Sequence, residues 1–139
     1  ISRCEAIYRT RHFEEDFAGI YHSYILVICR EPGMTQDWLA RYLCVNKSSV
    51  TRHLTNLEKK GYIERRTCEE DKRELRVYPT QKMLDIRSEV VRITREWNAL
   101  LQEGLTEEEI KFFNDIMERL TDKSREIIYG EKATNENNP

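Results

Sequence analysis

Two closely spaced helix starts followed by a helix stop constrain the fold of this chain more than any other feature. Thr35 and Asn46 are candidate N-caps, because short polar side chains before an apolar-periodic run accept the unpaired backbone N–H groups of a first turn. Gly61 follows two lysines and can take the left-handed conformation that ends a helix. Residues 35–61 therefore predict two short helices joined by a tight connection.

Two strand-like runs follow the second of these helices. Residues 62–67 and 74–78 are joined by a polar loop, and Pro79 comes directly after the second run. Two short runs of this kind predict a β-hairpin. A helix, a tight connection, a second helix and a hairpin make a winged helix-turn-helix. The sequence thus predicts a mainly α fold with a small β-hairpin wing.

The flanking segments have helical patterns that favour association. Residues 1–16 carry apolar side chains near helical period. The apolar run at 20–29 fits a helix or a strand, and the motif that follows it favours the helix. Thr80 begins a long predicted helix and Thr106 caps a final one. Apolar residues three and four apart line both, as an interhelical interface requires, so we expect these two helices to associate in a homodimer. These residues are Met83, Ile86, Val90, Ile93, Trp97 and Leu100, then Ile110, Phe113, Met117, Leu120 and Ile127. The alternative is that the two helices bury the stripe only against each other and the first helix.

Positive charge gathers in the middle of the chain. The net charge is −2, yet residues 35–82 hold 11 Lys/Arg and 7 Asp/Glu, whereas the remainder holds 12 and 18. Surface fields are screened within about 8–10 Å in physiological salt, so the local surplus matters more than the total. This surplus predicts an anionic partner.

Several classes of protein lack support in the sequence. No apolar run reaches the roughly 20 residues that span a bilayer, and no signal peptide is recognisable. Cys4, Cys29, Cys44 and Cys68 lack zinc-site spacing, and we expect reduced thiols in a cytoplasmic protein. Glycine-rich phosphate loops and nucleophile–base sets are missing too. We expect no enzyme activity, no cofactor, no metal site and no membrane partner.

The second helix carries short polar and basic side chains suited to a major groove of double-stranded DNA. Its first turn attracts phosphates through the helix N-terminus, Arg52 can bind guanine bidentately, and Asn56 can bind adenine. The basic hairpin, which includes Arg65, suits a narrow minor groove, and Asp71 can orient Arg73. The predicted DNA-binding residues are Thr35, Asn46, Lys47, Ser48, Ser49, Thr51, Arg52, Asn56, Arg66, Asp71, Lys72, Arg73 and Arg76.

These residues resemble the MarR (multiple antibiotic resistance regulator) family of bacterial regulators. The resemblance rests on a T-Q helix start at Thr35, on the recognition-helix pattern S-S-V-T-R-H-L-T-N-L-E-K-K-G, and on the D-K-R of the hairpin loop. It implies a dimeric repressor that binds a pseudo-palindromic DNA site and is released by a small-molecule inducer. The implied boundaries are a single MarR-like domain at 1–139, a winged-helix DNA-binding lobe at 21–82, dimerisation helices at 1–18 and 83–131, and a disordered tail at 132–139.

The chain departs from the family pattern in three places, one of which is the acidic pair Glu69 and Glu70 at the wing tip. A glycine expected after the wing is missing from the run Pro79-Thr80-Gln81-Lys82-Met83, which indicates a different junction into the long helix. The glutamine common early in the family's second helix is replaced around Ser23 and Tyr24.

Regulation leaves alternatives open. In the family an inducer pocket often lies between the dimer helices and the DNA-binding lobe, and the candidate lining residues are Phe13, Phe17, Tyr21, Tyr24 and Trp97. They could stack on a small aromatic inducer, or pack in the core or the dimer seam. Cys4 in the first helix is the candidate for thiol-based redox sensing instead. A winged-helix protein-interaction module that does not bind DNA is the remaining alternative, and it would not need Arg73 oriented by Asp71.

Overall fold

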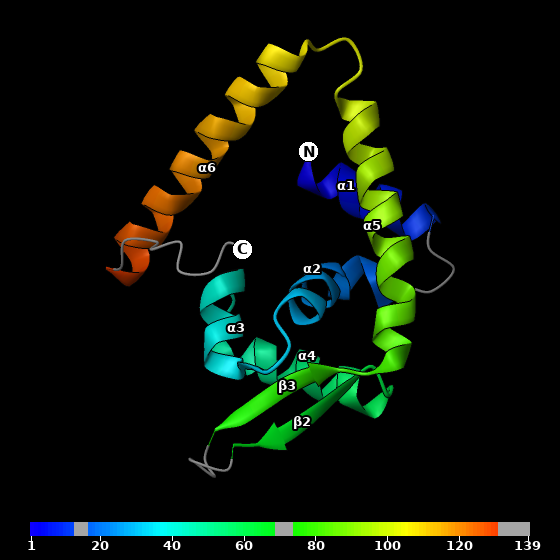
Figure 1. Cartoon of the computed structure of the whole chain (residues 1–139), viewed down its shortest axis with the longest axis vertical. Helices are drawn as coiled ribbons and strands as arrows, with labels where there is room; N and C mark the ends of the chain where they lie inside the picture. The colour runs from blue at the N-terminus through cyan, green and yellow to red at the C-terminus, as the bar shows by residue number, and fades with distance from the viewer. Residues whose placement is uncertain (13–16, 69–73, 131–139) are drawn as a thin grey trace. The chain divides into compact units, whose positions relative to one another are not determined.

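The computed structural model describes residues 1–12, 17–68 and 74–130, and only the backbone of residues 17–20. The chain divides into two compact units, Ile1–Asn98 and Ala99–Pro139. The elements, drawn in Figure 1, are α1 (Ser2–His12), α2 (Phe17–Arg30), β1 (Met34–Thr35), α3 (Gln36–Leu43), α4 (Lys47–Lys59), β2 (Ile63–Thr67), β3 (Leu75–Pro79), α5 (Gln81–Leu101) and α6 (Glu107–Tyr129). This is the mainly α fold with a small β wing that the sequence predicts.

The helix-turn-helix begins where the caps predict. Thr35 Oγ1 accepts the backbone N–H of Trp38 at 3.1 Å, and Asn46 Oδ1 accepts that of Ser49 at 2.8 Å. Between the two helices Cys44 takes a left-handed conformation with φ 54°. The two predicted N-caps are confirmed, and the turn between the helices is as tight as the spacing requires.

Hydrogen bonds connect the end of α4 with the junction into α5. Gly61 has φ 75°, and the N–H of Tyr62 folds back to the carbonyl of Leu57 at 2.9 Å. Thr80 Oγ1 donates to the carbonyl of Gly61 at 2.7 Å, and Lys82 Nζ donates to that of Lys60 at 2.9 Å. Side chains at the start of α5 are therefore bonded to the end of α4 at this junction.

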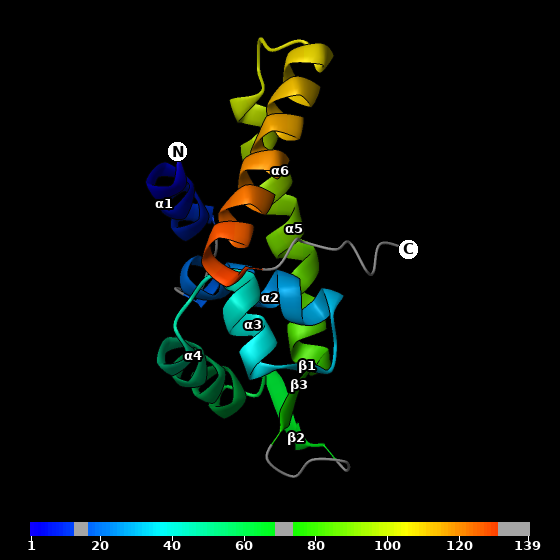
Figure 2. The ribbon, with the colours of Figure 1, turned by 90° about the vertical axis from the view of Figure 1, so that its left-hand side faces the viewer.

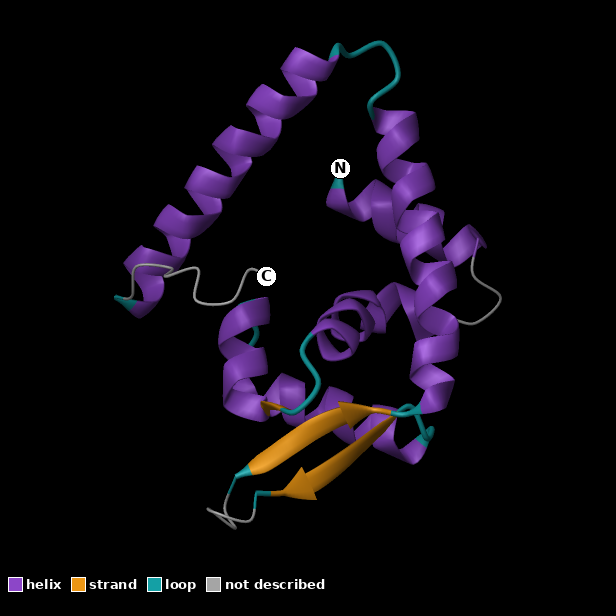
Figure 3. Cartoon of the chain, in the orientation of Figure 1, coloured by secondary structure: helices purple, strands orange, loops and turns teal. Residues whose placement is uncertain are grey.

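The sheet has one strand more than the predicted hairpin. Its order is β1-β3-β2, with both pairs antiparallel. Figure 3 shows β2 and β3 as two neighbouring arrows, and β2 contacts α4. β1 pairs Met34 with Val77 and Thr35 with Arg76. A strand of two residues is too short to give a periodic pattern, which is why the sequence predicts only the hairpin. β3 ends at Pro79, which is its last residue.

The core of the first unit lies between α2, α3, α4 and the sheet. The apolar run of α2 is helical, as the motif after it favours, although the helix begins at Phe17 and so contains Gly19. Ile25, Ile28 and Leu39 are fully buried. The predicted core face of α4 is confirmed, because Val50, Leu54 and Leu57 are also fully buried. α2 runs close to α4 and to α5 in both views (Figure 1, Figure 2).

Part of the apolar stripe of α5 is buried in the core of its own chain. Met83, Val90 and Ile93 are fully or almost fully buried within the first unit. Trp97 is partly exposed and Leu100 is 50% exposed. The stripe thus changes from core to surface along the helix.

α6 opens with the predicted capping box. Thr106 Oγ1 accepts the N–H of Glu109 at 3.2 Å, and Glu109 Oε2 accepts that of Thr106 at 2.8 Å. Large apolar side chains on this helix are exposed; they are Phe112, Phe113, Met117, Leu120, Ile127 and Ile128. Within the described ranges, none of the helices has both the length and the apolar character needed to span a bilayer.

Candidate nucleic-acid interface

The outer face of α4 presents the polar side chains that the sequence singled out. Ser48, Thr51, Arg52 and Asn56 are exposed. Ser48 Oγ donates to Asn46 Oδ1 at 2.8 Å. Ser48 lies in the first turn, where the partial positive charge of the helix N-terminus favours an anion.

Lys47 stands at the first turn of α4 and pairs with Asp37 of α3. The Nζ–Oδ2 distance is 2.7 Å, and the two side chains are 73% and 64% exposed. An ion pair this exposed contributes about 0–1 kcal/mol or less to stability. Lys47 can therefore exchange the carboxylate for an arriving phosphate at little cost.

One flank of α4 faces α2. His53 Nδ1 shares a hydrogen bond with the hydroxyl of Tyr24 at 3.0 Å, and Asn56 Nδ2 donates to the hydroxyl of Tyr21 at 3.3 Å. The structure therefore places Asn56, a predicted base reader, against Tyr21 of α2. Burial, and then the charge of Arg52, lowers the pKa of His53 below its ordinary value, so the imidazole is neutral near pH 7.

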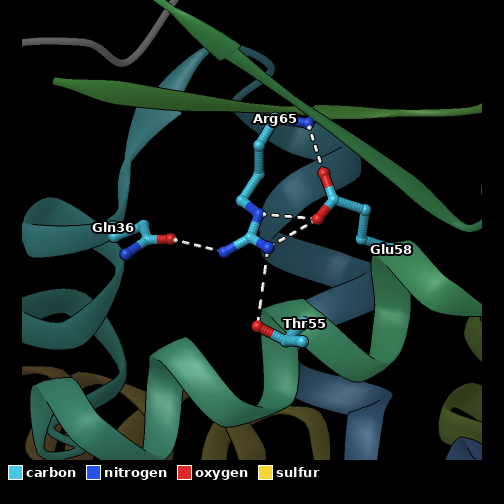
Figure 4. Close-up of polar contacts among 4 residues, drawn as sticks. All are labelled: Gln36, Thr55, Glu58 and Arg65. Atoms are coloured by element: carbon cyan, nitrogen blue, oxygen red, sulfur yellow. Dashed lines mark hydrogen bonds and ion pairs between the residues drawn. The ribbon is translucent and has the colours of Figure 1, made fainter.

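The opposite flank of α4 is joined to the wing by Arg65 (Figure 4). Its Nη2 and Nε lie 2.5 and 3.0 Å from Glu58 Oε2, and its backbone N–H donates to Glu58 Oε1 at 3.2 Å. Nη1 donates to Gln36 Oε1 of α3 at 3.3 Å, and Nη2 lies 3.5 Å from Thr55 Oγ1. The pKa of Glu58 is lowered, first by the hydrogen bond from Arg65.

Arg65 is thus a connector of β2, α3 and α4. The sequence interpretation counted it among the cations of the hairpin, but its side chain is only 17% exposed. Strand alternation was the signal for this: residues of β2 alternate between the two faces, and Arg65 shares the face of buried Ile63, whereas Arg66 points the other way.

Among the described residues of the wing, Arg66 and Arg76 form a cationic face. They are directly opposite in the β2–β3 register, an arrangement that repels unless counter-charges lie near. Glu64 lies 2.9 Å from Arg66, and Glu74 lies 3.5 Å from Arg76. Arg66 also lies over the ring of Tyr78, 4.6 Å from its centroid.

Arg76 is held in place by the backbone as well. Its Nη1 donates to the carbonyl of Gly33 at 3.1 Å. The pKa of Arg76 is raised, first by a hydrogen bond with Cys68 and then by Glu74. The other predicted wing residues, Asp71, Lys72 and Arg73, lie outside the described residues.

The predicted inducer-lining residues fall in different surroundings. Tyr21 and Tyr24 are 7% and 4% exposed and lie edge to face, with centroids 6.3 Å apart. Trp97 of α5 contacts Tyr8 of α1, with centroids 5.1 Å apart. Phe13 and the side chain of Phe17 lie outside what the structure describes. Cys4 is exposed on α1.

Two polar residues near the α1–α2–α5 contacts were missed by sequence reasoning. Arg9 forms an ion pair with Glu5, and its Nε is buried without a hydrogen-bond partner in the described part of the chain. His22 Nε2 donates to Thr94 Oγ1 at 2.8 Å, since that hydroxyl donates to the carbonyl of Val90. Burial, and then the charge of Arg9, lowers the pKa of His22 to about 4. Neither residue belongs to a motif that a sequence displays.

Metal chemistry finds no support in the same residues. Across the described ranges, no group of three or more His, Cys, Asp or Glu side chains could hold a metal ion. The polar groups of the site instead suit recognition of an anionic surface.

Comparisons with known proteins agree with this geometry. A family model described as "MarR family" matches residues 23–75. A crystal structure of MarR is 27% identical, with a TM-score of 0.78, and the match covers 93% of this chain and 88% of that one. A putative MarR family transcriptional regulator from Listeria monocytogenes, complexed with a 26mer DNA, shares the fold at 24% identity, with a TM-score of 0.84 and coverage of 99% and 93%.

FabT of Streptococcus pneumoniae, solved in complex with DNA, is similar at a higher identity. It is 30% identical to this chain, with a TM-score of 0.64, and the match covers 76% of this chain and 74% of that one. The family model covers the helix-turn-helix and most of the wing, and these structures extend the likeness to the flanking helices. The chain therefore belongs to the MarR family of transcriptional regulators.

Proposed function

We propose that this chain is a dimeric, sequence-specific DNA-binding repressor. The observation that carries the proposal is the pairing of an exposed polar and basic face on α4 with a basic wing fastened to that helix through Arg65. Such a pair can place a helix in the major groove while the hairpin contacts the neighbouring backbone or minor groove. FabT and the Listeria regulator, both solved with DNA, make the same partner reasonable for this chain.

Dimerisation is part of the same proposal. The helices at 1–18 and 83–131 would join two copies, and the exposed apolar side chains of α6 supply the surface that association would cover. Two lobes related by twofold symmetry would read a pseudo-palindromic site in double-stranded DNA, with half-sites about one helical turn apart.

Selection of bound duplexes from a random pool tests DNA recognition. The parent chain should enrich one pseudo-palindromic site, and its affinity should fall steeply with salt. Arg52→Ala should broaden the base preference, whereas Lys47→Ala should keep the preference and reduce the salt slope by about one for each phosphate that the lysine neutralises in the parent complex. Lys123→Ala on α6 is the control and should match the parent. A parent chain that enriches nothing, even at low salt, would favour the protein-interaction module instead.

Repression relieved by a small aromatic acid is the finer proposal. The Tyr8–Trp97 ring pair offers a stacking surface, and the buried Nε of Arg9 has an unused donor among the described residues. The lowered pKa of His22 reflects burial and the positive charge of Arg9 beside it. An aromatic acid that uncovers the buried Nε could accept its N–H on the carboxylate while the aromatic ring of the acid stacks on Trp97.

Calorimetry with benzoate and with benzyl alcohol tests this site. The acid should bind and the alcohol should not, and Arg9→Met should remove the difference. The acid should also release DNA from the parent chain. A peroxide arm with Cys4→Ser tests the redox alternative: release by peroxide that depends on Cys4, without an effect of the acid, would overturn the inducer proposal.

A further inference from the structure

The two hydrogen bonds between α2 and α4 form a ladder. Tyr21 and Tyr24 are three residues apart on α2, and Asn56 and His53 are three residues apart on α4. Residues at this spacing lie on one side of a helix. Tyr21 bonds to Asn56 and Tyr24 bonds to His53. A shift of either helix along its axis by one turn, or a roll of α4, would break both bonds.

The two tyrosine side chains that form this ladder are held in place by packing in the core. Their rings are 7% and 4% exposed and belong to the core cluster, so their positions are set by packing. A buried tyrosine hydroxyl normally requires a partner, and each of these two has one on α4. The ring of His53 meets Tyr21 and Tyr24 nearly at right angles, with centroids 5.5 and 5.2 Å away. Ring packing and hydrogen bonding therefore favour the same placement of this flank.

The other flank of α4 is held independently. Thr55 and Glu58, again three residues apart, lie at hydrogen-bond distance from Arg65 of β2. Arg52 lies between the two flanks on the helix surface and is exposed. Polar anchors on both sides thus fix the roll of α4 about its axis, and with it the direction in which Arg52 projects.

We propose that the hydroxyls of Tyr21 and Tyr24 are specificity-determining positioning groups, which hold α4 in the single orientation that reads DNA bases. The inference rests on the proposed DNA-binding function. Neither phenol touches the base itself; each acts through its partner on α4.

Asn56 shows how the hydroxyl acts. Bidentate reading of adenine needs the Asn amide turned in one sense, with oxygen toward N6 and nitrogen toward N7. The Tyr21 hydroxyl accepts from Nδ2 and leaves the second Nδ2 hydrogen and Oδ1 for the base. Without that hydroxyl the amide can rotate. The preference for adenine should then fall, while the phosphate contacts stay.

Tyr21→Phe and Tyr24→Phe test the proposal, because each keeps the ring and removes only the hydroxyl. For the site selected by the parent chain, each variant should lower the ratio of specific to non-specific affinity by about fivefold, the usual worth of one hydrogen bond. The salt slope and the non-specific affinity should equal those of the parent. Tyr62→Phe, at a tyrosine of the same lobe that is 3% exposed, is the matched control and should keep the ratio.

A double-mutant cycle separates positioning from general loosening. Tyr21→Phe should reduce base preference at one position of each half-site, and it should have no further effect in the Asn56→Ala background. Equal loss on specific and non-specific DNA, or an unchanged ratio in both Phe variants while Arg52→Ala lowers it, would overturn the inference.

A DNA-free readout distinguishes failure of this inference from failure of the proposed function. Nitrogen NMR of His53 should show a changed Nδ1 resonance in Tyr24→Phe and none in Tyr62→Phe, and α4 amides should exchange faster in the Tyr21→Phe, Tyr24→Phe double variant. If the parent binds no DNA, the proposed function fails and the specificity role fails with it, whatever the NMR shows. If the parent selects a site but His53 and the α4 amides are unaffected, only the ladder is wrong.

Discussion

Cys44 occupies a backbone conformation that suits glycine. With φ 54° it is the non-glycine residue with positive φ in the described ranges, and its N–H closes α3 by bonding to the carbonyls of Ala40 and Arg41. A side chain in this left-handed region costs roughly 1–2 kcal/mol because Cβ crowds the following carbonyl oxygen. The conformation is required by the tight turn between α3 and α4, so the strain lies next to the proposed DNA-reading helix.

Replacement of Cys44 by glycine should stabilise the fold. We expect the free energy of unfolding to rise by about 0.5–1 kcal/mol, since relief of crowding exceeds the added freedom of the unfolded chain. Urea titration followed by circular dichroism measures it. Cys44→Ala retains a Cβ and should show no such gain. A glycine variant no more stable than the alanine variant would show that the turn is unstrained.

Arg65 should contribute stability because its partner is left without a counter-charge when it is removed. Arg65→Met should lower the free energy of unfolding by about 1–2 kcal/mol, a value reduced from that of fully buried pairs because Glu58 is 38% exposed. Urea midpoints at pH 7 measure it. Arg92→Met, at an exposed arginine paired with Glu96, is the control and should change the midpoint little.

The same pair predicts a pH dependence. The folded-state pKa of Glu58 lies below the ordinary 4.5, so its contribution is present above pH 4.5 and is lost as pH falls through the lowered value. Arg65→Met should therefore flatten the acid side of the stability curve. An acid limb as steep as the parent's would assign that loss to other carboxylates.

At the scale of elements, local signals were predictable and non-local ones were not. Thr35, Asn46 and Thr106 cap their helices as predicted, because a cap and the N–H it accepts are three residues apart. The bond between His22 and Thr94 joins residues 72 positions apart, and no local pattern encodes it. The two-residue strand β1 was not predicted for a different reason: only its pairing with β3 makes it a strand.

For the candidate site, the sequence predicted residue types better than roles. Arg52 is exposed on α4 as predicted, whereas Arg65, predicted as a cation of the DNA-facing hairpin, connects three elements of the fold. Tyr21 and Tyr24, two of the five predicted inducer-lining residues, lie against the flank of α4. A buried aromatic has the same sequence signature whether it packs, positions or binds, and only its neighbours distinguish these roles.

The contact of α2 with α5 should depend on pH through His22. Its folded pKa is about 4 against an ordinary 6.5, so the unfolded chain binds the extra proton between these values. By linkage, stability is fully present above pH 6.5 and falls as pH drops toward 4. The expected loss is about 1–2 kcal/mol, after allowance for partial exposure.

Substitution by glutamine isolates this effect. His22→Gln keeps an amide N–H that can reach Thr94 and removes the titration. Chemical unfolding between pH 7 and pH 4 should therefore give a flatter curve than the parent's. His12→Gln, at an exposed histidine of α1, is the control and should leave the curve unchanged. A His22→Gln curve that keeps the parent's slope would place the titrating group elsewhere.

At the scale of the whole molecule, the unassociated chain leaves much apolar surface in contact with water. The α5 stripe ends in Leu100 and Leu101, which are 50% and 44% exposed, and α6 adds Phe112 and Ile127 at 68% and 70%. Monomeric soluble proteins rarely leave large contiguous apolar patches uncovered. The capping box shows that α6 begins as a well-formed helix, and its exposed apolar side chains are the surface that the proposed dimer would cover.

Charge placed in this apolar face should separate the proposed dimer. The double variant Leu120→Glu, Ile127→Glu should sediment at half the mass of the parent, because two carboxylates cannot be desolvated in an apolar seam without partners. Unit Ile1–Asn98 should stay folded, since its core uses neither residue. Lys123→Glu, a charge change at an exposed position of the same helix, should leave the dimer intact.

The variant that is monomeric should also bind DNA more weakly. A single lobe contacts one half-site and loses the gain of tethering two, so specific affinity should fall by about 10²-fold or more and the salt slope should fall by about half. A double variant that sediments like the parent would exclude this face of α6 from the interface, and a monomer that binds the full site as tightly as the parent would remove the reason to expect a palindrome.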